Sequence, residues 1–525
     1  MSRDPKNSVP TPESRGKSPG GSGSEDSGKF GYISHVAGGA AINFSGTVAR
    51  TVILYVYTFM LARMLSADEL GEFFLVLIVI DYAALIATVG LATGVTRFVA
   101  LYFGEGKNDQ ARNIVWVSLL IGVPIGIIFA IGMVLLAPFL NGLLFHESTT
   151  AVAGLRVFAV AIPMLVAAAI FNAATQGMHR MKYQVYSRDL TEQISKLGLS
   201  GLVLVMGSGL IGVIGANVAS IAVALSMALV FALKVLPKGK ESKARLSAPP
   251  RSFISYSLPL VFSGLLVTMQ TKVDTVLLGY FTTTANVGYY GVAIKVSTFA
   301  MKINVAFGTV FAPLISDLWN RRKSRDLSLL FKTVARWIFV LSLPIFVVLV
   351  VLADPIMGLF GESFVIGGNA LAVIAIGQFV NNCTGATGLM ILMSGRSKLE
   401  LFNISLFFAV DAAICLLLIP RFGIMGAAIA NMVSIAGVNV TRALEVWFLM
   451  RLHAYDRNYL KAVFAGVSGA LVLFIASRYM VGAVKLGIMS FLFLVYYVLV
   501  MLVLGLSDED KSVFLVIKNR LLGAH

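Results

Sequence analysis

The sequence predicts an all-α polytopic membrane protein of about 14 transmembrane helices, arranged as two parallel six-helix lobes plus two C-terminal helices. Its composition is the first support, since 58% of the residues are hydrophobic, only 13% are charged, and the mean hydropathy is +0.86. Apolar runs of about 20 residues, the length that spans a bilayer, recur along most of the chain. These runs are too long and too uniform for barrel strands, so helices satisfy the backbone. Motifs of the first half also return in the second half.

The chain begins with a predicted disordered tail, residues 1–29, which is rich in Ser, Pro, Gly and charge and has no apolar segment typical of a signal peptide. Fourteen apolar runs follow, near residues 35–64, 71–101, 113–139, 152–176, 186–207, 210–236, 252–281, 287–316, 329–353, 365–393, 398–419, 422–451, 459–478 and 485–505. We expect an N-terminal lobe (30–236), a basic linker (237–251), a C-terminal lobe (252–452), two additional helices (453–507) and a C-terminal tail (508–525).

The loops predict the orientation of the chain. Lys and Arg gather in alternate loops, as in Lys107 with Arg112, Arg180 with Lys182, and the linker. The first five intervening loops, such as "SADELG" (66–71), are neutral or acidic. Basic loops stay in the cytoplasm, so both termini and the linker are expected there. Topology thus accounts for the net charge of +16, and we expect no nucleic-acid partner.

An internal repeat relates the two halves. "TFMLARMLSADELG" (58–71) returns as "TVLLGYFTTTANVG" (275–288) at an offset of 217 residues, and "GLIGVIGANVASI" (209–221) returns as "GIMGAAIANMVSI" (423–435) at an offset of 214. Arg180-x-Lys182 returns as Arg396-x-Lys398 at an offset of 216. Each copy holds six helices, an even number, so both copies have the same orientation and form parallel repeats. A transporter of this kind places its substrate between the repeats.

Other features exclude several function classes. The chain has no P-loop and no large loop with acidic catalytic residues, which argues against an ATPase or a membrane glycosyltransferase. Its two cysteines lie in apolar spans, and its five histidines show no ligand spacing. We therefore expect no enzymatic activity, no cofactor and no metal centre.

Two segments carry a family resemblance. "SYSLPLVFSGLLVTMQTKVDTVLLGYFTTTANVGYYGVAIKV" (255–296) and "ADPIMGLFGESF" (353–364) resemble the polysaccharide transporters, the lipid-linked oligosaccharide flippases of the multidrug/oligosaccharidyl-lipid/polysaccharide exporter superfamily. The resemblance extends over residues 35 to 450. It implies a flippase that moves a polyprenyl-(di)phosphate oligosaccharide to the outer leaflet of an archaeal or bacterial plasma membrane. Membrane lipids and glycan-assembly enzymes are its implied partners.

Charged residues within the spans are the candidate site. Each costs about 2.5–3.5 kcal/mol to insert, so each should face a wet interior. A cationic path suits an anionic lipid-linked headgroup, and for this we select Arg50, Arg97, Lys272, Lys295 and Lys302. Ion-coupling or salt-bridge roles, with H⁺ or Na⁺ as the coupling cation, are expected for Asp81, Asp274, Asp411 and Glu192.

Spacing adds three expectations about these charges. Lys295 and Lys302 are two turns apart and would line one face of a helix. Lys272 and Asp274 point about 200° apart, so each needs a partner on another helix or in water. Glu192 and Lys196 are spaced for a local ion pair.

Two alternatives remain open at this stage. An ion-coupled antiporter of drugs or organic cations would show an acidic cavity, whereas the charges here are mainly basic. A non-transporting scaffold of a glycan-assembly complex would not need intramembrane charges in both lobes.

Overall fold

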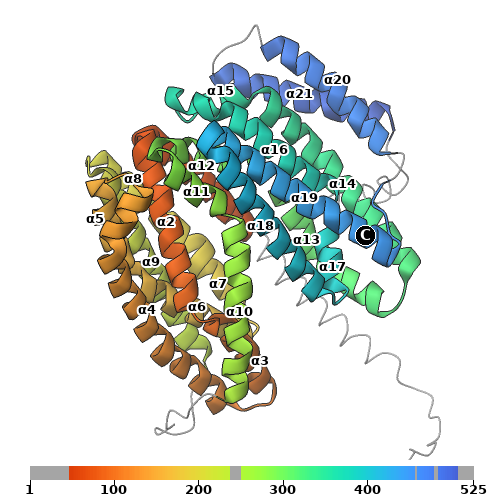
Figure 1. Ribbon diagram of the computed structural model, residues 1–525. Coiled ribbons are helices and arrows are strands. Elements are labelled where there is room, and N and C mark those ends of the chain that lie inside the picture. Colours follow the sequence, from red (N-terminus) through yellow and green to blue (C-terminus); the bar gives the residue numbers. More distant parts are fainter. Residues whose placement is uncertain (1–45, 237–249, 456–457, 478–482, 506–525) are drawn as a thin grey trace, which may run out of the picture.

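The computed structural model describes residues 46–236, 250–455, 458–477 and 483–505, and these residues form helices joined by short connections (Figure 1). The N-terminal lobe contains a first helix at residues 46–64, α2 (Ala67–Ala87), α3 (Leu91–Gly104), α4 (Asn108–Leu144), α5 (Thr149–Ala159), α6 (Ala161–Gly177), α7 (Lys182–Gln184), the π-helix η1 (Val185–Thr191), α8 (Glu192–Val205) and α9 (Gly209–Val235).

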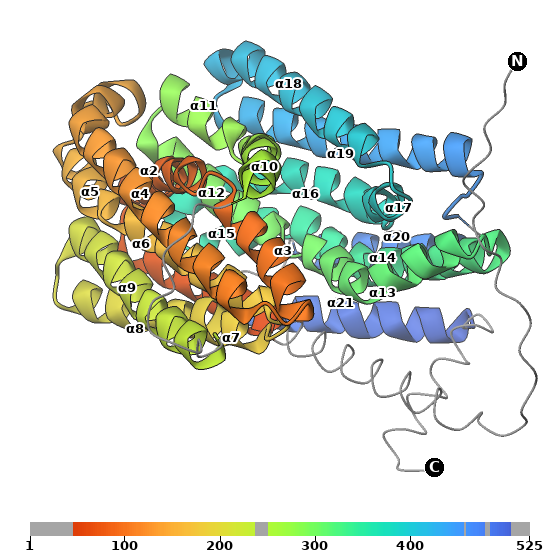
Figure 2. The same ribbon diagram turned by 90° about the horizontal axis from the view of Figure 1, so that it is seen from below.

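The C-terminal lobe contains α10 (Arg251–Gln270), α11 (Val273–Phe281), α12 (Thr284–Ser297), α13 (Met301–Asn320), α14 (Ser324–Val351), α15 (Ala353–Gly358), the 3₁₀ helix η2 (Glu362–Gly367), α16 (Gly368–Cys383), α17 (Thr387–Met393), α18 (Ser397–Phe422) and α19 (Ile424–Met450). Two further helices, α20 (Tyr459–Ser477) and α21 (Ala483–Val503), pack on the outside of this lobe against α14 (Figures 1 and 2). The predicted tails (1–29 and 508–525) and nearly all of the linker lie outside the described residues.

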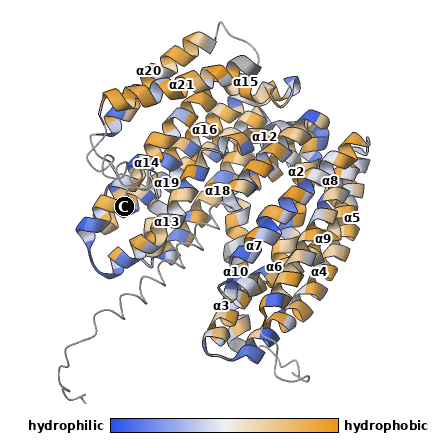
Figure 3. Ribbon diagram, turned by 180° about the vertical axis from the view of Figure 1, so that it is seen from behind, coloured by the Kyte–Doolittle hydropathy of each residue, from blue (hydrophilic) through white to orange (hydrophobic). Residues whose placement is uncertain are grey.

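The membrane-spanning, all-helical class is confirmed. Ten helices of the described residues are long and apolar enough to cross a bilayer, or 11 if a bent pair in α13 counts as one span. Each of the predicted apolar runs contains helical residues, but the number 14 is not confirmed. Hydrophobic residues make up most of the length of the helices, and hydrophilic residues gather at several helix ends (Figure 3).

Several predicted helices are wrong as continuous elements: 71–101, 152–176, 252–281 and 287–316 each fold as two helices, and 365–393 is divided among η2, α16 and α17. Gly90 shows why the first of these is interrupted. Its φ of +67° suits glycine, and a β-carbon there would lie 2.1 Å from the carbonyl oxygen of Ser257 on α10. The interruption therefore lets α10 pack closely against the α2–α3 junction.

The internal repeat is also structural. Ser66 caps α2, accepting from the Glu69 amide at 3.2 Å while the Glu69 carboxylate accepts from the Ser66 amide at 2.9 Å. Thr283, the counterpart of Ser66 at the offset of 217, caps α12 by accepting from the Asn286 amide at 3.5 Å. Both repeats thus begin their second helix with the same kind of cap.

The two lobes touch where α2 crosses α12 (Figure 1). A β-carbon on Gly71 would lie 1.8 Å from the carbonyl oxygen of Thr284, and one on Gly288 would lie 2.2 Å from that of Ala67. The offset of 217 relates Gly71 to Gly288 and Ala67 to Thr284, so the two contacts are exchanged by a pseudo-two-fold axis. We call this backbone contact the glycine crossing.

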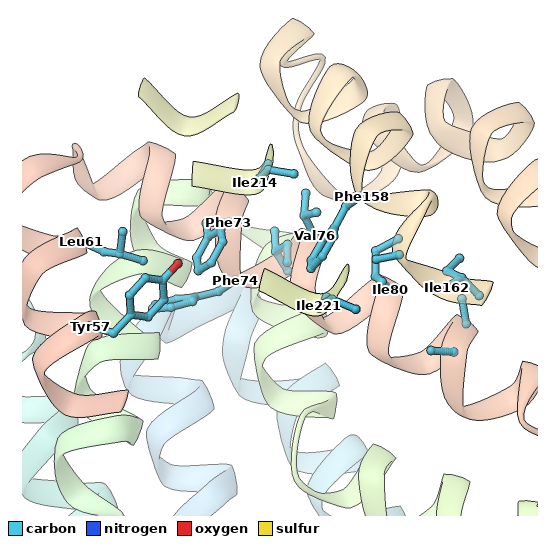
Figure 4. Close-up of a cluster of buried hydrophobic side chains, with 14 of the residues drawn as sticks. Tyr57, Leu61, Phe73, Phe74, Val76, Ile80, Phe158, Ile162, Ile214 and Ile221 are labelled. Carbon is cyan, nitrogen blue, oxygen red and sulfur yellow. The ribbon is translucent and has the colours of Figure 1, made fainter. Parts of the chain in front are cut away.

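Packing around α2 forms the core of the N-terminal lobe (Figure 4). Leu61, Phe73 and Ile80 are fully buried there. Figure 4 shows Phe73 and Phe74 beside Tyr57 of the first helix, and Val76 near Phe158 of α5. This core holds α2 rigidly on the lobe axis, where it can position charged side chains.

Candidate functional site

Five cations come together from five segments of the two lobes, and we call this group the central cationic site. The charge of Lys295 interacts with those of Lys196 and Lys272, and the charge of Lys302 interacts with that of Arg50. Three carboxylates accompany them, so the basic side chains outnumber the acidic ones by two. The members are Arg50, Lys196, Lys272, Lys295 and Lys302, with Asp81, Asp189 and Glu192.

Lys272 lies at the interruption between α10 and α11, not inside a helix. Its Nζ is 2.6 Å from Oδ2 of Asp81 on α2, which joins the two lobes by an ion pair. The side chains are 28% and 49% exposed, so the pair remains accessible to solvent or ligand. As expected, the partner of Lys272 lies on another helix.

Charge reversal tests this interlobe pair. We expect Lys272→Asp alone to slow transport, and Lys272→Asp with Asp81→Lys to recover part of the loss, because the swap restores the attraction. A double-mutant cycle on thermal stability should give a coupling energy of only about 0.2–1 kcal/mol, since both side chains are partly exposed. If the effects of the two substitutions were strictly additive on both transport and thermal stability, Lys272 and Asp81 would not act as a pair.

The other cations have distinct partners. Nη1 of Arg50 is 3.2 Å from Oδ1 of Asp189 in η1. Nζ of Lys295 lies 4.1 Å from the ring centroid of Phe74 and 3.5 Å from Oγ1 of Thr58. Lys295 is therefore held at the lobe interface by an aromatic face and a hydroxyl, and no carboxylate within the described residues forms an ion pair with it.

Two spacing expectations are wrong. Lys295 belongs to α12 and Lys302 to α13, and the chain leaves the helical path between them, so they do not share one helix face. Among the described residues no ion pair joins Glu192 to Lys196, whose Nζ instead lies 5.3 Å from the ring centroid of Tyr57. The first expectation fails because the helix is interrupted between Lys295 and Lys302. The second fails because the ring of Tyr57 competes with Glu192 for the ammonium group of Lys196.

Arg97 and Glu192 face a different space, a cavity of about 570 Å³ that the N-terminal lobe forms together with Tyr256 of α10. Helices α2, α3, α6, α9 and α10 contribute to its walls, together with η1. The guanidinium of Arg97 stacks 4.1 Å from the ring centroid of Tyr256. Asp81 borders both this cavity and the central cationic site, so the two spaces adjoin.

Asp274 and Asp411 form a third group, buried in the C-terminal lobe. Asp274 accepts hydrogen bonds from the Tyr290 hydroxyl at 2.6 Å, the Asn431 amide at 2.9 Å and the Thr275 backbone amide at 2.6 Å. Asp411 accepts from the Cys415 thiol at 3.7 Å. Hydrogen bonds from neutral donors, rather than a cation, satisfy Asp274.

Sequence reasoning did not select Asp189, Arg188 or Lys196 as site residues. Arg188 and Asp189 lie in the π-helix η1, whose wider turn changes the direction of neighbouring side chains. The density of charge at residues 188–196 was the available signal. No cluster of three or more His, Cys, Asp or Glu in the described ranges is arranged to hold a metal ion.

Comparison with solved structures identifies the fold. A structure of the lipid II flippase MurJ in an inward closed conformation superposes with a TM-score of 0.70, at 15% identity over 92% of this chain and 99% of that one. An inward-facing multidrug resistance MATE family transporter superposes with a TM-score of 0.63, at 14% identity over 77% of this chain and 94% of that one. The chain therefore has the fold of these two-lobed membrane transporters.

Sequence comparison identifies the family. The probable low-salt glycan biosynthesis flippase Agl15 of Haloferax volcanii is 23% identical over 73% of this chain and 77% of its own length, and the probable flippase AglR of the same organism is 23% identical over 78% and 84%. Residues 259–417 match the MatE family. Residues 36–319, more than half of the chain, match the family described as polysaccharide biosynthesis protein. The resemblance in sequence is thus confirmed, and the chain belongs to the polysaccharide biosynthesis protein family.

Proposed function

We propose that this protein is a flippase, which moves a lipid-linked glycan from the cytoplasmic to the outer leaflet by alternating access. The central cationic site is the observation that carries the proposal. A polyprenyl phosphate or diphosphate headgroup is anionic, and an excess of basic over acidic side chains between the lobes offsets the cost of removing it from water. The lipid tail stays in the bilayer throughout.

The family and its relatives support this assignment. The two sequence relatives named above, Agl15 and AglR of Haloferax volcanii, are both called probable flippases. Non-enzymatic transport across an archaeal or bacterial plasma membrane, upstream of surface glycan assembly, fits these names. Glycan-assembly enzymes would then supply and consume the substrate.

The loop charges give the orientation we propose. The loops at Lys107, Arg180 and Arg321 are basic, whereas the first turn of α2 is acidic at Asp68 and Glu69. The positive-inside rule then places the glycine crossing near the outer surface and both termini in the cytoplasm. In Figure 1 the ribbons of the lobes diverge from this crossing toward the basic ends, the arrangement expected of an inward-facing state.

The buried carboxylates of the C-terminal lobe are where a coupling cation would act. Asp274 and Asp411 interact electrostatically in a space that also holds Tyr290 and Asn431. Taking up H⁺ or Na⁺ would neutralise part of this buried charge and thereby shift the balance between conformations. The same acidic pair, with the MatE match, favours a second candidate function, an ion-coupled antiporter of organic cations.

Flipping of a fluorescent polyprenyl-diphosphate oligosaccharide in proteoliposomes tests the proposal. We expect the wild-type chain to flip this probe, and Lys295→Ala with Lys302→Ala to lower the rate about 10- to 100-fold, because charge-assisted contacts to phosphate are worth about 1.5–3 kcal/mol. Lys323→Ala with Lys398→Ala is the matched control, because it removes two exposed lysines outside the central cationic site.

Each outcome separates the candidate functions. Flipping that survives in the Lys295 and Lys302 double variant would move the headgroup site elsewhere. A wild-type chain that flips no carrier but drives efflux of organic cations would establish the antiporter. A chain that does neither would favour a non-transporting scaffold.

A further inference from the structure

The cavity in the N-terminal lobe has a different chemistry from the central cationic site beside it. Its charged lining is balanced, with two guanidinium groups and two carboxylates. Hydroxyl and amide side chains add neutral donors and acceptors from α3, α6, α7 and the residue that follows α2. The charged members of the lining are Asp81, Glu192, Arg97 and Arg188, and the neutral polar ones are Thr88, Thr93, Thr96, Asn172, Gln176 and Gln184. Groups of this kind, beside the ring of Tyr256, match the alternating hydroxyl and C–H surfaces of a carbohydrate.

Hydrogen bonds along the wall hold some of these groups in place. Thr96 Oγ1 donates to Gln176 Oε1 at 3.3 Å, and Gln176 Nε2 donates to Gln184 Oε1 at 2.7 Å. Ser187 Oγ donates to Asn172 Oδ1 at 2.7 Å. In the part of the chain that the structure describes, the amide nitrogens of Asn172 and Gln184 have no acceptor. They are positioned donors that a ligand in the cavity can use.

Small residues keep the cavity open. Its volume of about 570 Å³ lies within the range of roughly 300–1,000 Å³ that holds drug-sized ligands. Six alanines line it, on α2, α3, α6 and α9: Ala84, Ala92, Ala168, Ala169, Ala173 and Ala224. Larger side chains at these positions would fill the space that the ligand needs.

The C-terminal repeat shows that the fold itself does not require this polar lining. At the offset of 216, the positions of Asn172, Gln176, Arg188 and Glu192 hold Gly388, Leu392, Ile404 and Phe408. A β-carbon on Gly388 would lie 3.3 Å from Nε of Arg442, which forms an ion pair with Glu400, the counterpart of Gln184. The C-terminal lobe thus places an internal ion pair where the N-terminal lobe leaves a polar space. A feature present in only one of two equivalent lobes indicates a function beyond the fold.

The backbone of η1 adds a second local departure. The π-helical turn at residues 185–191 presents Arg188 to the cavity and Asp189 to Arg50 in the central cationic site. Single π-helical turns occur frequently at functional sites. One irregular segment therefore serves both spaces.

We propose that the N-terminal lobe cavity is a carbohydrate subsite, which binds the sugars nearest the phosphate while the phosphate occupies the central cationic site. This inference rests on the proposed function, and it assigns the two chemical halves of the headgroup to two adjoining spaces. Asp81 marks their boundary, because it lines the cavity and pairs with Lys272. The ligand class is a neutral or zwitterionic saccharide of one to three residues.

Two fluorescent probes test the subsite in proteoliposomes of the full chain: bare polyprenyl diphosphate and the same carrier bearing glucose or N-acetylglucosamine. We expect the wild type to flip a glycosylated probe faster than the bare one. Ala169→Phe, which fills the cavity, should slow the glycosylated probe about tenfold, the equivalent of about 1.4 kcal/mol, and leave the bare probe within about twofold. Gln176→Leu, which introduces the residue of the other repeat, should act in the same direction.

Controls make the outcomes distinct. Ala219→Phe adds the same bulk at an exposed position of α9 outside the cavity, and it should change neither rate. Unchanged flipping of the bare probe reports that each variant is folded. Equal slowing of both probes by Ala169→Phe, or no slowing of either, would overturn the subsite and leave the flippase. A wild-type chain that flips neither probe would overturn the proposed function itself.

Discussion

Gly71→Val is expected to abolish flipping in proteoliposomes. A β-carbon at Gly71 would lie 1.8 Å from the carbonyl oxygen of Thr284 and 3.0 Å from the amide nitrogen of Gly288, and this backbone of α12 cannot move aside as a flexible side chain could. Valine therefore forces α2 and α12 apart and removes the state in which the lobes meet at the glycine crossing. Because alternating access requires both states, we expect the flipping rate to fall at least 100-fold, to background. Gly288→Val should have the same effect, because it faces Ala67 in the equivalent contact.

Gly132→Val is the matched control, because nothing lies within 4 Å of a β-carbon built at that position on α4. Spin-label distances across the lobes should widen near residues 67 and 284 in Gly71→Val and stay unchanged in Gly132→Val. Normal flipping by Gly71→Val would mean that the glycine crossing is not part of the transport cycle.

Asp274→Ala is expected to lower the free energy of unfolding by about 3 kcal/mol and to stop transport. The aspartate is fully buried and accepts from Tyr290, Asn431 and Thr275. Its removal leaves the amides of Asn431 and Thr275 without this acceptor, and it leaves the Tyr290 hydroxyl only the carbonyl oxygen of Ala427 at 3.3 Å. Thermal and denaturant unfolding in detergent measure the stability, and the flipping assay measures transport.

The N-terminal repeat supplies the matched control. Tyr57 is the counterpart of Asp274 at the offset of 217, and its hydroxyl accepts from Asn217, the counterpart of Asn431, at 2.8 Å. Tyr57→Phe removes one neutral hydrogen bond and should cost about 1 kcal/mol. Asp274→Asn removes the charge of the side chain and keeps its shape. We expect this variant to have near-normal stability and to lose the dependence of transport on the coupling cation. Asp274→Asn that transports with unchanged ion dependence would reduce Asp274 to a structural role.

The sequence predicted the features that depend on composition and repetition. Hydropathy located the helical segments, and the repeat predicted two parallel lobes. The contact of Gly71 and Gly288 at the axis between them comes from the structure. Buried charge was also visible, because Asp274 and Asp411 stand out in apolar runs. The helical segments and the buried charges can be recognised in the sequence because the bilayer penalises polar groups wherever they lie along the chain.

Features that depend on tertiary contact were not predictable. The interruption at Gly90 lies in an apolar run without a nearby proline, so the contact with α10 there is invisible to periodicity. The interruption at Lys272 lies beside polar residues, but it too has no nearby proline. The partner of Lys272 is 191 residues away on α2. The π-helix η1, which sorts Arg188 and Asp189 into two spaces, has no sequence signature of its own. Spacing rules assume a continuous, ideal α-helix. The chain departs from that geometry at Lys272 and in η1, which are positions that supply charged side chains to the site.

The glycine crossing also suggests how such a chain could arise. Reciprocal contacts, in which Gly71 meets Thr284 and Gly288 meets Ala67, are the pattern of an isologous interface between two copies of one subunit. A half-length ancestor with a single glycine could have paired with itself through the same surface before duplication and fusion. After fusion, each copy had to fit only one side of the interface, so the two copies could differ in sequence. One became free to carry an acid at the position of Asp274 while the other kept the neutral hydroxyl of Tyr57.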